Sequence, residues 1–147
     1  MREILFRGRD IAGNWHYGVP LIFTEDFVCI TAPHTYNKAV QPETVGQFTG
    51  STDKNGKKIF EGDVVDFYFF DKGHKNTKTM LIEWRDSGFG MRELYRDYRL
   101  ADDFSIIAEK IFTYRGDIRN GVYTTNNTYF VEVIGNIHDN PELLKGE

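Results

Sequence analysis

Residues 49–65 read Thr-Gly-Ser-Thr-Asp-Lys-Asn-Gly-Lys-Lys-Ile-Phe-Glu-Gly-Asp-Val-Val. This stretch contains two turn signals, and the most apolar strand of the sequence starts at its end. Asn55-Gly56 suits a tight turn because both residue types tolerate a positive φ. In the second turn, residues 61–63, Gly62 can supply a left-handed conformation that is costly for a residue with a Cβ. We therefore expect two consecutive turns that set the register of the following strand.

The strand after the second turn, residues 64–70, is apolar on both faces. Val65, Phe67 and Phe69 alternate on one face, and the opposite face is apolar except for Asp66. A strand that is covered on both sides, or that lies at the centre of a small barrel, has this composition. We predict that residues 64–70 form the central strand of the fold.

The N-terminal part of the sequence predicts short strands joined by turns. Residues 3–9 alternate as a half-buried strand, and residues 15–17 resume the pattern after a turn, which predicts a hairpin. Residues 21–23 and 27–31 are two further short apolar strands. Residues 33–43 have no periodicity, and we expect a surface loop that crosses to the main core.

The C-terminal half predicts more strands and little helix. The expected extended segments are residues 79–84, 89–94, 105–115, 122–125 and 128–134. A short helical turn is expected near residues 100–104. Another is expected at the C-terminus, where Pro141 suits the first helical position and Asn140 could cap it. Many short strands with frequent turns predict a mainly β fold, a small barrel or roll.

Composition narrows the class of protein. With 147 residues the chain is one domain, or one domain with an N-terminal appendage. A net charge of −4 counts against a general nucleic-acid binder, which neutralises phosphates. The single cysteine, Cys29, forms no intramolecular disulfide and fits a reducing cytoplasm. No apolar run approaches the roughly 20 residues of a transmembrane helix, so we expect no membrane association.

Three blocks of the sequence resemble the YopX family, a small group of proteins encoded by bacteriophages and prophages. The opening Met1–Arg7 is similar to the family's N-terminus. The central block, with its Thr-Gly, Asp-Lys-Asn-Gly and Glu-Gly-Asp elements, is similar to the family's most characteristic motif. The ending, residues 131–137 with 140–144, is similar to the family's C-terminus. Residues 8–45 and 92–130 carry no motif that aligns.

The resemblance implies an SH3-like β-barrel or roll of short antiparallel strands. We expect this roll over residues 46–147, with a short C-terminal helical turn, and an N-terminal β segment over residues 1–45 that packs on the core. The resemblance also implies a phage or prophage origin and expression in the cytoplasm of the bacterial host. It implies no activity, and no catalytic residue is carried over from it.

The family motif contains the first set of candidate residues. They are Thr49, Gly50, Asp53, Asn55, Gly56, Glu61, Gly62 and Asp63. Paired carboxylates at Glu61 and Asp63, with Asp53 nearby, could serve acid–base chemistry or hold a cation. The simpler interpretation is that these residues form structural turns. The four histidines and the one cysteine show no zinc-ligand spacing, so we expect no metal and no cofactor.

A second set of candidates forms a basic and aromatic edge. Its members are Lys72, Lys75, Lys78, Trp84, Arg85, Phe89 and Arg92. Lysines beside aromatic side chains resemble a surface on which single-stranded nucleic acid stacks its bases. SH3-like barrels also bind peptides through exposed aromatic residues. The structural alternative is that the lysines solvate a hairpin loop and the aromatic residues belong to the core.

These observations predict a phage accessory protein that acts as a binding module and not as an enzyme. We expect a protein partner, which is a second copy of the chain in a homo-oligomer or a host or phage factor. A single-stranded nucleic-acid-binding module is the first alternative, and an enzyme is the second.

Overall fold

The computed structural model describes residues 3–34, 36–71, 73–85, 88–94, 100–104, 111–114, 116–123 and 128–144. Within these ranges the strands are β1 (Phe6–Arg9), β2 (Trp15–Thr24), β3 (Phe27–Thr31), β4 (Lys38–Val40), β5 (Gly46–Thr52), β6 (Lys58–Phe60), β7 (Asp63–Asp71), β8 (His74–Arg85), β9 (Gly88–Leu94), β10 (Leu100–Phe104), β11 (Val122–Tyr123) and β12 (Thr128–Asn136). Short 3-10 turns lie at η1 (Pro42–Thr44) and η2 (Pro141–Leu144), and residues 111–113 are helical. The prediction of a mainly β fold with little helix is confirmed.

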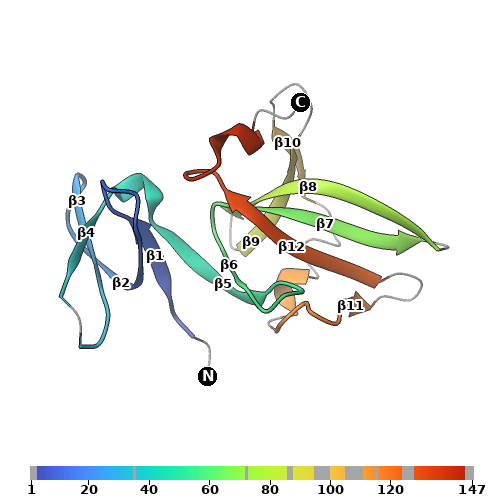
Figure 1. The fold of residues 1–147 in the computed structure, drawn as a ribbon, viewed down its shortest axis with the longest axis horizontal. Helices are drawn as coiled ribbons and strands as arrows, with labels where there is room; N and C mark the ends of the chain where they lie inside the picture. The colour runs from blue at the N-terminus through green and yellow to red at the C-terminus, as the bar shows by residue number, and fades with distance from the viewer. Residues whose placement is uncertain are drawn as a thin grey trace. The chain divides into compact units, whose positions relative to one another are not determined.

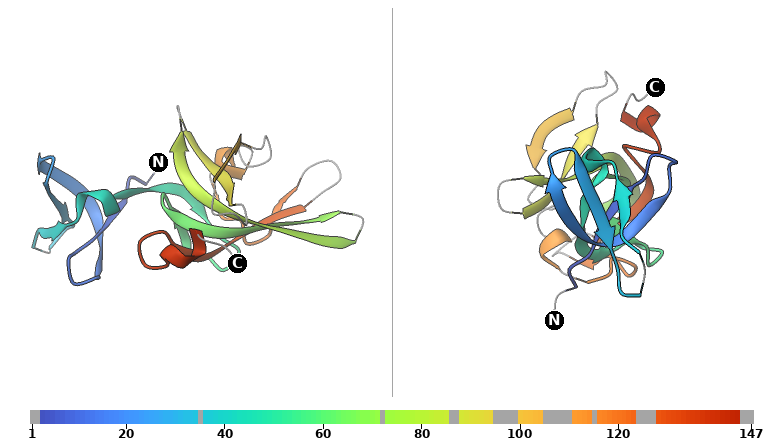
Figure 2. Two further views of the ribbon diagram at one scale, coloured as in Figure 1. Left: turned by 90° about the horizontal axis from the view of Figure 1, so that it is seen from above. Right: turned by 90° about the vertical axis from the view of Figure 1, so that its left-hand side faces the viewer.

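The strands form two antiparallel sheets (Figure 1). The first has the order β4-β3-β2-β1-β5-β6, and the second has the order β10-β9-β8-β7-β12-β11. The second sheet curls strongly into a half-barrel, as the left view of Figure 2 shows. In the described ranges, no helix has the length and apolar character needed to cross a lipid bilayer.

By internal contacts the chain divides into two compact units. Unit 1 is Met1–Phe48 and unit 2 is Thr49–Glu147. The strand β5 therefore begins in unit 1 and ends in unit 2. The expectation that residues 1–45 pack on the rest of the chain stays a prediction.

Unit 1 is built around β2, which is longer than predicted. It pairs with β1 through residues 15–18 and with β3 from Val19 onward, so the strand changes partner without ending. Residues 38–40 add β4 to the edge of β3, and η1 follows. The prediction of a surface loop over residues 33–43 is therefore wrong from residue 38 onward, because hydrogen bonding to β3 makes residues 38–40 a strand without a periodic sequence and η1 follows. Val28, Ile30 and Val40 form the small core of this unit.

Unit 2 is built around β7, as the sequence predicts. This strand lies between β8 and β12 and pairs with both over nearly its whole length. Val65 and Phe67 belong to the main hydrophobic core, and Phe69 packs against it. The other buried residues of this core are Ile59, Met80, Ile82, Met91, Ile111, Phe112, Ile118, Val122, Tyr129 and Val131.

Two local predictions in the C-terminal half are wrong. Residues 100–104 form the strand β10 instead of a helical turn, because Leu100 and Phe104 pair with β9. Residues 111–113 are helical and not extended. Residues 105–110 and 115 lie outside the described part of the chain. The short C-terminal helical turn at Pro141 is confirmed by η2.

Gly62 adopts the left-handed conformation that its turn predicts, with a φ of 90°. Its N–H donates to the Ile82 carbonyl at 2.9 Å, and its carbonyl accepts from the Ile137 N–H at 3.0 Å. We predict that Gly62→Val lowers the free energy of unfolding by about 1–2 kcal/mol, because a side chain with a branched Cβ is strained at this φ. Chemical denaturation followed by circular dichroism measures the change.

Gly88→Val is the matched control for this variant. An added Cβ at Gly88 meets no atom within 4 Å, and its φ lies outside the left-handed region. We expect wild-type stability or a slight gain at this strand position. A Gly62→Val protein as stable as wild type would show that the turn relaxes without cost.

Candidate binding surface

Asp53 connects the first turn of the family motif to the last long strand of the sheet. Its side chain is 1% exposed. Its Oδ1 accepts the N–H groups of Asn55 and Lys57, both at 2.9 Å, which closes the turn. Its Oδ2 accepts the Val133 N–H at 2.9 Å, from a residue 80 positions later. The register of β12 against β7 shifts between Val133 and Gly135, so the pattern of hydrogen bonds between the two strands is irregular there. Asp53 accepts the Val133 N–H at this place, so that this backbone donor has a hydrogen-bond partner.

The other motif residues also have structural contacts. Asp63 is 1% exposed and accepts the Phe60 N–H at 2.7 Å. Thr49 Oγ1 donates to the Ile59 carbonyl at 2.8 Å. Gly50 and Gly56 both have φ in the left-handed region, at 93° and 83°.

The carboxylates of the motif are not gathered into a cation site. Asp53 and Asp63 each point at backbone amides, and Glu61 is partly exposed. Among the described residues, no group of three His, Cys, Asp or Glu side chains could hold a metal ion.

The basic and aromatic edge is divided between the two faces of the sheet. Lys78, Trp84 and Phe89 lie on the face that carries Met80 and Ile82, because alternate residues of a strand share a face.

Lys75 and Arg92 lie on the opposite face of the sheet from Lys78. Lys72 and the side chain of Arg85 lie outside the described part of the chain. The role of these residues in binding stays a prediction.

Two of these cations are matched by carboxylates. Arg92 Nη2 lies 2.8 Å from Glu83 Oε1, and Lys78 Nζ lies 3.6 Å from Glu93 Oε2. Each pair joins neighbouring strands, β8 and β9. These contacts reduce the positive charge that the edge presents to a polyanion.

The structure brings a different lysine to the outer face of β7. Lys54 and Lys75 both lie over the Tyr68 ring, with Nζ at 5.2 and 4.4 Å from its centroid. Tyr68 in turn stacks on Phe130, with ring centroids 5.4 Å apart. Lys54 reaches this place because its N–H donates to the Val131 carbonyl at 3.0 Å. Sequence reasoning missed Lys54, since that contact joins segments far apart in the chain.

Lys54 is also paired with Glu132, with Nζ 3.2 Å from Oε2. Hydrogen bonds to Tyr68 and Glu132 raise the pKa of Lys54. Glu132 and Asp66 are register partners on this same outer face. The face is therefore aromatic with nearly balanced charges.

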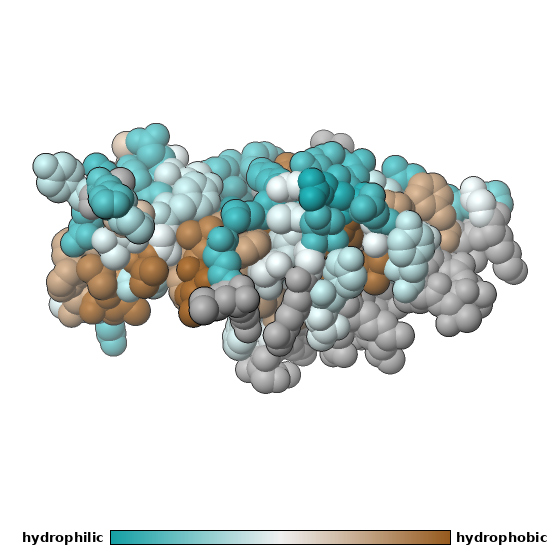
Figure 3. Space-filling view, turned by 90° about the horizontal axis from the view of Figure 1, so that it is seen from below, coloured by the Kyte–Doolittle hydropathy of each residue, from teal (hydrophilic) through white to brown (hydrophobic). Residues whose placement is uncertain are grey.

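Unit 1 exposes a row of large apolar side chains, which we name the β2–β3 apolar face. Its exposed fractions are 49% for Tyr17, 48% for Val19, 39% for Leu21, 58% for Phe23 and 47% for Phe27. The first four alternate along β2, and the Phe23 and Phe27 rings lie 5.2 Å apart. Figure 3 shows hydrophobic residues gathered at the surface of unit 1. The small core of Val28, Ile30 and Val40 lies on the other face of this sheet.

Sequence reasoning identified segments of this face as short strands but did not assign it a role. The usable signal was the alternation of Tyr17, Val19, Leu21 and Phe23 over seven consecutive positions. The sequence prediction ends one strand at residue 17 and starts the next at residue 21, so it separates Tyr17 from Leu21 and Phe23. The pattern also gives no information on whether the apolar side is covered.

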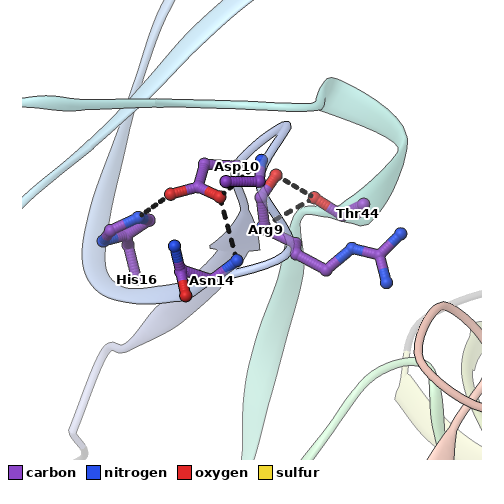
Figure 4. Close-up of polar contacts among 6 residues, drawn as sticks. Arg9, Asp10, Asn14, His16 and Thr44 are labelled. Atoms are coloured by element: carbon purple, nitrogen blue, oxygen red, sulfur yellow. Dashed lines mark hydrogen bonds and ion pairs between the residues drawn. The ribbon is translucent and has the colours of Figure 1, made fainter.

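The turn between β1 and β2 holds a compact polar cluster (Figure 4). Asp10 Oδ1 accepts the N–H groups of Ala12 and Asn14, both at 2.9 Å. Asp10 Oδ2 lies 2.8 Å from His16 Nε2. The hydrogen bond to His16 is the largest cause that lowers the pKa of Asp10 to about 2, and the bond from Asn14 adds to it. This cluster fixes the hairpin, in which β1 pairs with β2.

The chain is similar to known proteins over most of its length. A family model described as YopX protein matches residues 21–145. A comparison with curated proteins found no match. Among solved structures, the chain is similar to protein EF1440 from Enterococcus faecalis, with 24% sequence identity and a TM-score of 0.49. That match covers 98% of this chain and 99% of the other.

We predict that Asp53→Asn lowers the free energy of unfolding by about 1–3 kcal/mol. An amide replaces one acceptor oxygen by an NH₂ group, which then faces a backbone N–H that needs an acceptor. Urea denaturation at neutral pH measures the loss. Asp26→Asn is the matched control, because Asp26 is exposed in the β2–β3 turn. Equal stability of the two variants would contradict the structural role of Asp53.

The Asp10 carboxyl gives a prediction for pH. Because its folded pKa of about 2 lies below the ordinary value of 3.8, the His16 contact stabilises the fold above about pH 4. This contribution is lost as the pH falls from about 4 to about 2. In an NMR titration of the carboxyl carbon, we expect a midpoint near 2 in wild type and a higher midpoint in His16→Ala. The same midpoint in both proteins would rule out His16 as the main cause.

Proposed function

This chain belongs to the YopX family, and we propose that it is a binding module without enzymatic activity that recognises a protein through the β2–β3 apolar face. The single observation that carries the proposal is the exposure of five large apolar side chains on one side of a short hairpin. A patch of this kind on a monomer commonly marks an interaction site. The phage or prophage origin and the cytoplasmic location that the family resemblance implies belong to the same proposal.

The composition of the face supports protein recognition. Tyr17, Phe23 and Phe27 supply aromatic area, and aromatic residues are enriched at the centre of protein interfaces. Val19 and Leu21 supply aliphatic area between them. None of these five side chains carries a charge, so a partner that covers them buries no charge among them.

The family motif supports a structural role for its carboxylates over a catalytic one. Asp53 and Asp63 accept backbone N–H groups and are almost completely buried. A general acid or base must reach a substrate, and these two side chains point into turns. We further propose that unit 2 is an SH3-like roll, which its curled antiparallel sheet around β7 supports.

A nucleic-acid partner is less well supported. Lys54 and Lys75 lie on the aromatic outer face of β7, but Glu132 and Asp66 lie there too. A binder of single strands needs a positively charged groove along the backbone of the nucleic acid. The charge on this face favours a protein partner over a nucleic acid.

The test compares Phe23→Asp with Ile11→Asp. Both side chains are exposed, at 58% and 93%, but Ile11 lies in the β1–β2 turn and outside the apolar face. The full chain with an affinity tag is produced in host cells that also make a second copy of the chain with a different tag. The proteins captured with the affinity-tagged chain, including the second copy, are quantified by mass spectrometry. We expect Phe23→Asp to reduce specific capture at least tenfold and Ile11→Asp to leave it unchanged. Equal capture by both variants would overturn the proposed surface.

A further inference from the structure

We infer that the partner that covers the β2–β3 apolar face is a second copy of this chain, packed face to face about a two-fold axis. The inference rests on the proposed function, because it names the partner of the same surface. The chemistry of the face, its area and the charges at its two ends support this partner.

The chemistry of the face permits contact between identical surfaces. In a two-fold interface, each residue near the axis meets the same residue of the other copy. A charged residue there would meet its own charge, and this repulsion selects against self-association. Val19 and Leu21, in the middle of the row, are both uncharged, so two copies can approach without that penalty.

The exposed area is enough for a reversible dimer. A large apolar side chain presents on the order of 200 Å², so five that are about half exposed present on the order of 500 Å². Two copies would together bury on the order of 1,000 Å², which is near the lower limit for a specific interface. We therefore expect association that depends on protein concentration, and not a permanent dimer.

The charges at the two ends of the row fit an antiparallel arrangement. Arg9 pairs with Trp15, so it lies at the start of β2 on the same face, where it is partly exposed. Arg7, which pairs with Tyr17, is 5% exposed with its guanidinium over the Trp15 ring, so Arg9 supplies the accessible positive charge at this end. Residues 25 and 26, a glutamate and an aspartate, form the turn at the other end of this strand. From residue 17 to residue 23 a strand spans about 20 Å.

A two-fold axis perpendicular to the strands, near Val19 and Leu21, reverses the second copy. It brings Arg9 of each copy next to the acidic turn of the other. A parallel arrangement would instead place like charges together at both ends. The charge distribution therefore selects the antiparallel dimer.

The first experiment is sedimentation velocity of the full chain from low micromolar to millimolar concentration. We expect the mass of wild type to rise from monomer to dimer over this range. Phe23→Asp should raise the midpoint of association at least tenfold, and Ile11→Asp should leave it unchanged. Circular dichroism checks that each variant is folded. A wild-type chain that is monomeric at every concentration would overturn the inference.

The second experiment tests the arrangement by cross-linking. In a Cys29→Ala background, Val19→Cys places a thiol near the proposed axis, while Ile11→Cys places one outside the face. We expect disulfide-linked dimers from the first under mild oxidation and none above background from the second. Similar yields from both would overturn the two-fold packing on this face.

The outcomes separate this inference from the proposed function. If the chain stays monomeric but Phe23→Asp still loses capture of other proteins, the partner is a different protein and only the inference fails. If the chain stays monomeric and Phe23→Asp captures as wild type does, the proposed function fails as well. Self-association that Phe23→Asp weakens and Ile11→Asp leaves intact supports both.

Discussion

The structure of unit 2 depends on one buried carboxylate. Asp53 accepts three backbone N–H groups, two within its own turn and one from Val133 in β12. Burying a charged group in a protein is costly unless it is hydrogen-bonded, and three donors satisfy much of what water would otherwise supply. The same contact fixes the turn against the strand, and β12 in turn pairs with β7 along most of its length. A local turn therefore holds two distant segments of the chain in register.

Once β7 is fixed between β8 and β12, strand alternation decides the role of each aromatic residue. Phe67 and Phe69 face the main core with Tyr129, whereas Tyr68 faces outward and stacks on Phe130. On the outward face the ammonium groups of Lys54 and Lys75 lie over the Tyr68 ring, where the ring quadrupole attracts a cation. A one-residue shift in register would exchange the two sets, so the turns of the family motif determine both the core and the surface.

Unit 1 contrasts with unit 2 because its core is small. Val28, Ile30 and Val40 are buried, and Phe6 and Val45 pack against them, on one side of a short sheet. A small unit buries a smaller share of its surface than a large one, so its second face stays open unless a partner covers it. The apolar character of that open face is unfavourable in water, and it is the physical basis of the proposed interaction.

The sequence by itself determined the features that depend on neighbouring residues. The turn at Asn55-Gly56, the left-handed Gly62, the two-sided apolar strand β7 and the turn at Pro141 follow from local conformational preferences and from alternation. Tertiary structure decided the rest. Pairing with β9 made residues 100–104 a strand, and pairing with two partners made β2 continuous. It also decided that Asp53 binds Val133, that Lys54 lies over Tyr68, and that the apolar side of β2 is exposed. An alternating strand has the same sequence pattern whether its apolar face is covered or open, because the covering residues come from elsewhere in the chain or from another molecule.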